Sequence, residues 1–191
     1  MAKGVVFSEY EIRSIGFKFG EGPSYDSVEC IGSCDEALDT RKIIKKCRGI
    51  IVKEVVKGTG TGKLKITAHI PYDIFCKMYG MDNPNLVTGV KSYGSTSKHE
   101  SFSMVADVFD EDDKEKFKAY PNCIMESGVT QKIKNGEEEV AELELEISIM
   151  PDEKGQGLYE VLVDDLAEDT KQLKTNWMTK FTPELVAVEA A

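Results

Sequence analysis

Apolar and polar residues alternate with a period of two along several segments of the chain. In residues 63–70 the apolar positions share one face. Residues 142–149 repeat the pattern more regularly, with three carboxylates on the opposite face. This period is typical of β-strands that bury one face against a core. The three carboxylates belong to Glu142, Glu144 and Glu146.

Further strand-like runs, and the turns between them, favour an antiparallel arrangement. The runs cover residues 41–47, 50–56, 102–108, 117–124 and 158–163. Turn-forming residues separate the strand patterns, and they lie at 57–63, 110–113, 135–136 and 155–157. We expect the glycine-rich residues 57–63 to form a hairpin loop. The succession predicts a mainly β protein, an antiparallel β-sandwich or barrel, and not alternating strands and helices.

Two segments have helical spacing. Residues 71–80 begin with proline, carry an apolar stripe and end in glycine, which predicts one short helix flanking the sheet. Near the end of the chain, Leu173, Trp177 and Phe181 recur at every fourth residue, which indicates a second helix.

The remaining segments are loops and arms within one domain that spans residues 1–191. Residues 82–100 are poor in apolar side chains and form a long loop, and loops of this length in compact domains are usually functional or disordered. Residues 1–23 are expected to form an N-terminal arm with the first strands. Residues 166–191 are expected to form a C-terminal arm that ends in a loose tail.

Charge and targeting signals exclude several classes of protein. The formal net charge is −10, which argues against a protein that binds nucleic acid through its phosphates, because such binding requires a basic surface. An acidic surface is compatible with DNA that slides past without adsorbing. The chain shows neither a signal-peptide pattern nor the roughly 20 apolar residues that span a bilayer. We therefore expect synthesis in a cytosol-like compartment and no membrane partner.

Tests for phosphate and metal sites are negative. Three residues separate Gly58 from Gly62, one fewer than the four that a P-loop needs, and a strand pattern follows where a helix should begin. The acidic residues 110–113 lack the glycine and glutamate of an EF-hand loop and indicate a solvated turn. Cys30 and Cys34 have no second cysteine pair at zinc-like spacing.

Catalytic chemistry has no support either. The chain contains two histidines, and neither lies in a nucleophile motif. We expect no enzyme activity and no cofactor. The five cysteines are expected to be reduced and mostly packed. The glutamates at 142, 144 and 146 have two open interpretations: a plain solvent-facing strand, or the lining of a negatively charged channel.

Several segments form a recognisable series: a strand followed by a helix in residues 65–80, and then residues 118–123, 136–147, 150–153 and 177–185. This series resembles the major tail protein (tail tube protein) family of long-tailed, non-contractile bacteriophages and prophages of Gram-positive bacteria. The resemblance covers roughly residues 50–185 and is carried mainly by the C-terminal half.

The resemblance implies a β-sandwich tail-tube fold, shared with the inner tubes of contractile tails, whose subunits form hexameric rings. Strands of neighbouring subunits then join into one barrel around the channel, which leaves no free sheet edge. It also implies a virion tail location after synthesis in the host cytoplasm. The partners it implies are further copies of the chain, the tape measure, tail terminator and distal tail proteins, and double-stranded DNA in transit. A C-terminal decoration domain, present in some members, is expected to be absent.

These expectations assign roles to particular residues. Glu142, Glu144 and Glu146 are the candidates for the lumen, where they would repel the DNA backbone. The long loop and the arms are expected to supply contacts between subunits and rings, and the candidate contact residues are Tyr93, His99, Trp177 and Phe181. Two alternatives remain: the inner tube of a contractile tail or bacteriocin particle, and a monomeric β-sandwich binding module.

Overall fold

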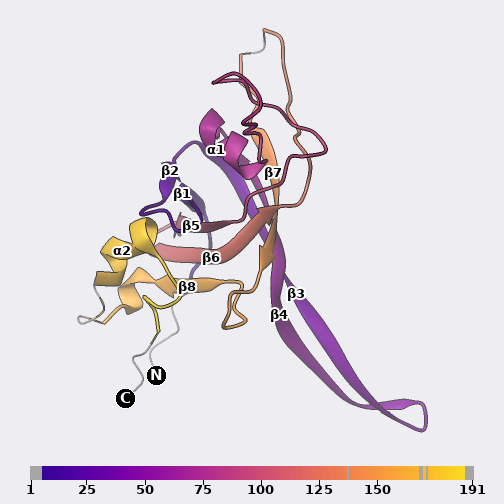
Figure 1. The fold of residues 1–191 in the computed structure, drawn as a ribbon. Coiled ribbons are helices and arrows are strands. Elements are labelled where there is room, and N and C mark those ends of the chain that lie inside the picture. Colours follow the sequence, from indigo (N-terminus) through magenta and orange to yellow (C-terminus); the bar gives the residue numbers. More distant parts are fainter. Residues whose placement is uncertain (1–5, 137, 168–169, 171, 188–191) are drawn as a thin grey trace.

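The computed structural model describes residues 6–136, 138–167, 170 and 172–187. Over this part of the chain, eight strands form one antiparallel sheet in the order β2-β1-β5-β6-β7-β4-β3, with β8 paired to β6 beside that path (Figure 1). The prediction of a mainly β, antiparallel fold is confirmed. The strands are β1 (Glu11–Phe19), β2 (Asp26–Val28), β3 (Ile31–Cys47), β4 (Ile50–Ala68), β5 (Phe102–Phe109), β6 (Glu115–Met125), β7 (Leu143–Met150) and β8 (Tyr159–Leu162).

The sheet curls on itself because β6 changes partner along its length. Its first half pairs with β8 at residues 116–119, and its second half pairs with β7 at residues 122–125. The main core lies between the two halves: Phe17 and Met104 from β1 and β5 pack in the same cluster as Ile66 and Leu145 from β4 and β7. The result is a sandwich-like arrangement of one continuous sheet.

The predicted helix at 71–80 is confirmed as α1 (Tyr72–Met78). Pro71 precedes the first helical residue, and its fixed φ suits a helix start. Gly80 ends the helix with φ +58, and a side chain there would approach the carbonyl oxygen of Lys98. Phe75 and Met78 bury their side chains in the main core, so α1 closes one end of the sandwich.

The predicted C-terminal helix is confirmed as α2 (Gln172–Lys180), which follows the short 3₁₀ helix η1 (Val163–Asp165). It covers the outer face of β5 and β6, where a second core contains Val105, Phe117 and Ala119. The strands β5 and β6 therefore contribute side chains to the main core from one face and to the second core from the other.

The longest feature is a hairpin formed by β3 and β4, which extends far beyond the body of the molecule (Figure 1). Its turn is Arg48-Gly49, with φ of +51 and +82, and Cys47 pairs with Ile50 on either side. Two residues in this conformation are the type I′ turn that matches the twist of a hairpin. The predicted strands at 41–47 and 50–56 are thus the two strands of one hairpin.

The expectation that residues 57–63 form the hairpin loop is wrong. These residues lie inside β4, where Gly58 pairs with Thr40 and Gly62 pairs with Leu38. The glycines serve a bulge and a close approach: a side chain on Gly60 would lie 2.6 Å from the carbonyl oxygen of Gly155. These glycines lie at the base of the β3–β4 hairpin, next to the turn between β7 and β8.

The other predicted turns agree with the structure. Residues 110–113 connect β5 to β6, where the buried Asp110 carboxylate accepts hydrogen bonds from the backbone N–H groups of Asp112 and Lys114. Residues 155–157 lie in the turn between β7 and β8. All five cysteines are free thiols, but Cys30 and Cys47 are exposed, so the expectation of mostly packed cysteines holds only in part.

Candidate functional site

Two of the three candidate lumen glutamates lie on the exposed face of β7. Glu144 forms an ion pair with Lys132, and this hydrogen bond holds the pKa of the Glu144 carboxyl below its ordinary value. Glu146 lies 3.8 Å from the Nζ of Lys65 on β4. The alternation therefore placed both carboxylates on the expected face, where both interact with lysines.

Glu142 differs from the other two. It precedes β7, and its carboxylate lies so close to Gly32 that a side chain there would come within 2.2 Å of it. The surrounding face of β4 and β7 also carries Lys63, which contacts Glu126 at 2.5 Å, and Lys65. On this face, lysines therefore lie among the carboxylates and pair with them. Its position in a lumen stays a prediction.

Tyr93 and His99 anchor the loop at 82–100 to the body. The backbone carbonyl of Met125 lies 2.9 Å from His99 Nδ1, and Tyr93 Oη lies 3.1 Å from His99 Nε2. The carbonyl oxygen can only accept a hydrogen bond, so Nδ1 is the donor in that contact. The His99 ring also packs edge-on against Tyr79. Tyr93 is exposed, and the roles of Tyr93 and His99 in contacts between subunits stay predictions.

Trp177 and Phe181 do not lie on a contact surface. Only 2% of Trp177 and 1% of Phe181 is exposed, because both rings fill the second core against Phe117 and Tyr159. The indole N–H donates to the carbonyl of Lys118 at 3.2 Å. The expectation that these two residues contact other subunits is corrected: in this structure they attach α2 to the chain's own sheet.

The outer part of the β3–β4 hairpin, residues 41–57, is hereafter the ribbon. It contains seven lysines and arginines against the single carboxylate of Glu54, a net charge of +6. Since the whole chain carries −10, the remainder carries −16. Apart from the half-buried Val55, every ribbon residue is exposed. The exposed apolar side chains are Ile43, Ile44, Ile50, Ile51, Val52 and Val56.

Charges within the ribbon repel each other. Directly opposed positions on the two strands hold Arg41 against Lys57 and Lys45 against Lys53, and such like-charge pairs are destabilising. Among the described residues, Lys42 is the one ribbon cation with an ion-pair partner, Glu54 at 2.9 Å. The ribbon thus exposes both unneutralised charge and apolar surface.

A groove of about 1160 Å³ lies between the first strand and the start of β3. Its floor includes Lys118, whose ammonium lies 2.7 Å from Glu9 and 3.0 Å from Glu36. Burial would lower the pKa of Lys118, but its hydrogen bonds to these carboxylates outweigh burial and raise it. Tyr120 donates its hydroxyl to the same Glu36 carboxylate. This buried network had no counterpart in the sequence patterns.

Asp107 on β5 is an unusual carboxylate. Its Oδ1 is buried without a hydrogen-bond partner among the described residues. Burial and the neighbouring Glu115 raise the pKa of Asp107 to about 6, against opposing contributions from Arg13 and Lys174. Protonated Asp107 therefore stabilises the fold. This contribution is complete below the ordinary pKa of 3.8 and is lost as the pH rises through about 6.

We expect Asp107→Asn to be more stable than the wild type at pH 7.5 and equally stable near pH 4. Because the carboxyl is half-buried, solvent screening limits the gain to about 1 kcal/mol, or about 3 °C in melting temperature. Thermal unfolding followed by circular dichroism at the two pH values measures the difference. A variant that is less stable than the wild type at pH 7.5 would contradict the assignment.

The described residues contain neither a metal-binding cluster nor a membrane-spanning helix. In this part of the chain, no group of three or more His, Cys, Asp or Glu side chains is arranged to hold a metal ion. No helix found there has the length and apolar character needed to cross a membrane.

Comparisons with known proteins return structural neighbours only. No protein-family model matches the chain, and no curated protein matches it in sequence. One structural neighbour is the tube-terminating cap of the anti-feeding prophage, with 10% identity over 85% of this chain and 96% of that chain, at a TM-score of 0.44. Another is a chain of the six-fold symmetrised anti-feeding prophage baseplate, with 12% identity over 87% of this chain and all of that chain, at a TM-score of 0.45.

Proposed function

We propose that this chain is a structural subunit of a phage-type tail tube, which assembles with copies of itself into stacked hexameric rings around a DNA-conducting channel. The observation that carries the proposal is the ribbon. It exposes six branched apolar residues and a net charge of +6 on a chain whose remainder carries −16. Exposed apolar strands with unpaired edges favour association, and here the chain itself supplies the opposite charge.

The sequence resemblance to major tail proteins supports the same function. The resemblance covers residues 50–185, which include one strand of the ribbon, the glutamate strand β7 and the helix α2. An assembly role also accounts for the absence of a catalytic constellation in the sequence. Transit of DNA accounts for the excess of carboxylates, which repel phosphates.

Sedimentation velocity of the purified chain over a concentration series tests self-association. The proposal expects species much larger than a monomer of 21.2 kDa, with a proportion that rises with concentration. The rival function, a monomeric β-sandwich binding module, expects one slow species at every concentration.

The lumen assignment has its own test. We expect the double variant Glu144→Lys with Glu146→Lys to keep its fold, because both side chains are exposed and charge changes at the surface cost little stability. We expect tubes of this double variant to retain a short DNA duplex at about 50 mM salt in a nuclease-protected form, and to release it at about 200 mM. Wild-type tubes should retain none.

The matched control reverses two carboxylates in the β5–β6 turn, Glu111→Lys and Asp112→Lys, with the same change of charge. Duplex bound by control tubes should remain open to nuclease. If duplex bound by the Glu144 and Glu146 variant is digested equally fast, these two residues lie on the outer wall.

A further inference from the structure

The groove beside β3 is complementary to the ribbon in charge and in polarity. Six carboxylates and three cations line it, and its apolar lining includes Ile31, Val108 and Leu158. The three cations already have partners: Lys118 and Lys116 contact Glu9, and Arg13 contacts Glu11. Two further lining carboxylates, Glu29 and Asp35, are exposed and form no ion pair with any described residue.

The backbone at this groove is also free to bind a strand. β3 is the last strand in the sheet order, so its outer edge carries unpaired N–H and C=O groups in the described chain. Residues 31–36 of that edge line the groove. An extended segment can add to such an edge by main-chain hydrogen bonds, with its side chains on the two faces of the sheet.

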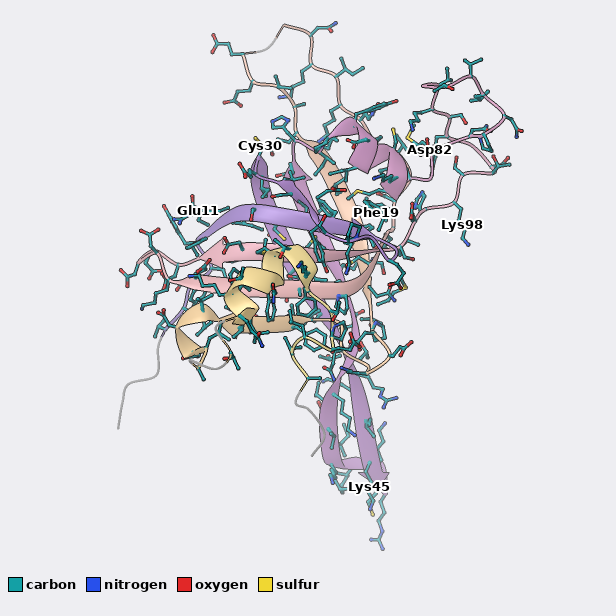
Figure 2. The ribbon with its side chains drawn as sticks, turned by 60° about the vertical axis from the view of Figure 1, so that its left-hand side comes forward. Glu11, Phe19, Cys30, Lys45, Asp82 and Lys98 are labelled. Carbon is teal, nitrogen blue, oxygen red and sulfur yellow. The ribbon has the colours of Figure 1, made fainter. Side chains whose placement is uncertain are left out.

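The tip of the ribbon and the groove lie at separate ends of the same molecule. Figure 2 shows Lys45 at the far end of the molecule from Glu11, which lines the groove, and from Cys30, which precedes β3. A ribbon cannot reach the groove of its own chain in this arrangement. Two different surfaces of one chain that fit each other produce a head-to-tail contact, which propagates into rings or filaments.

We infer that the ribbon of one copy docks in the β1–β3 groove of the next copy, with Lys46 and Arg48 against Glu29 and Asp35. This inference rests on the proposed function and names the contact that builds the assembly. It brings carboxylates to a ribbon whose cations are mostly without ion-pair partners among the described residues, and it covers the apolar side chains of the ribbon. Duplex DNA is the other anion available to a basic ribbon, but a phosphate backbone would leave the branched apolar residues exposed.

A charge-reversal experiment tests the pairing. One variant reverses the ribbon, Lys46→Glu with Arg48→Glu, and a second reverses the groove, Glu29→Lys with Asp35→Lys. Each alone places like charges together, and we expect the concentration for half-assembly to rise at least about 100-fold. A 1:1 mixture should assemble within about tenfold of the wild type, because each ribbon then meets a groove of opposite charge. Matching circular dichroism and melting temperatures exclude misfolding.

Each outcome is decisive. If the groove-reversed variant assembles normally while the ribbon-reversed variant does not, the ribbon docks elsewhere; the docking inference fails and the proposed function stands. If the mixture of the two variants does not assemble, the ribbon cations and the groove carboxylates do not face each other across one contact, and the docking inference fails. If the ribbon binds a short duplex and its reversal abolishes this binding without changing assembly, DNA is the occupant. A wild-type chain that stays monomeric overturns the proposed function, and the inference with it.

Discussion

Removing residues 43–55, the outer part of the ribbon, should abolish self-assembly without unfolding the subunit. In a suitable variant, Asn-Gly replaces residues 43–55, so that the pair Lys42 and Val56 closes a two-residue turn. We expect particles much larger than the monomer to disappear at every concentration tested. The reason is that the ribbon carries most of the exposed branched apolar side chains of the hairpin and a strongly basic surface on an acidic chain.

The subunit itself should tolerate this deletion. Every side chain removed is exposed except that of Val55, so no core contact is lost, and a melting temperature within about 2 °C of the wild type is expected. Sedimentation velocity and thermal unfolding on the same preparation separate the two effects. Assembly that persists unchanged would show that the ribbon is not the contact. A large loss of stability would show that the ribbon supports the fold.

The second large effect concerns Trp177. We expect Trp177→Ala to destabilise the chain by about 3–5 kcal/mol, because it removes a buried ring between α2 and β6 and leaves a cavity beside Phe117 and Phe181. Urea unfolding followed by circular dichroism measures the loss, since this is the only tryptophan and its fluorescence is removed by the change.

Two variants serve as controls for the Trp177 measurement. Trp177→Phe keeps a ring and loses the N–H bonded to the carbonyl of Lys118, so its cost should be about 1–2 kcal/mol. Tyr10→Ala, at a ring that is 77% exposed, should change stability by less than about 0.5 kcal/mol. If Trp177→Ala costs under about 1 kcal/mol and instead weakens assembly, the indole acts between subunits, as the resemblance to tail tube proteins implied.

Local patterns in the sequence predicted the elements well. Strict alternation identified β7 and placed Glu144 and Glu146 on its exposed face, because a half-buried strand shows its period directly. Proline and glycine at the two ends identified α1. The glycines of residues 57–63 led to a wrong prediction of a hairpin loop, because glycine is common both in turns and in β-bulges. The true turn, Arg48-Gly49, contains only one glycine and lies in a highly charged stretch of sequence.

Features that depend on distant residues were not predictable. The fourfold spacing of Trp177 and Phe181 indicated a helix, but it carries no information about which strands the helix would cover. Lys118 alternates with Phe117 and Ala119, so it had the pattern of a solvent-facing residue. Its side chain is buried on the face opposite α2, where Glu9 and Glu36 fold over it and pair with its ammonium group. The net charge of −10 gave no sign of the basic ribbon, because a net charge sums positive and negative regions of the surface.

Negative-stain electron microscopy of the purified wild-type chain, concentrated at low salt, shows whether copies of this chain form a hollow tube. We expect six-fold rings or hollow tubes with a stain-filled channel, and we expect none in the ribbon-deleted variant prepared in parallel. A field of uniform small particles in both samples, at concentrations well above those used for sedimentation, would contradict the proposed tube.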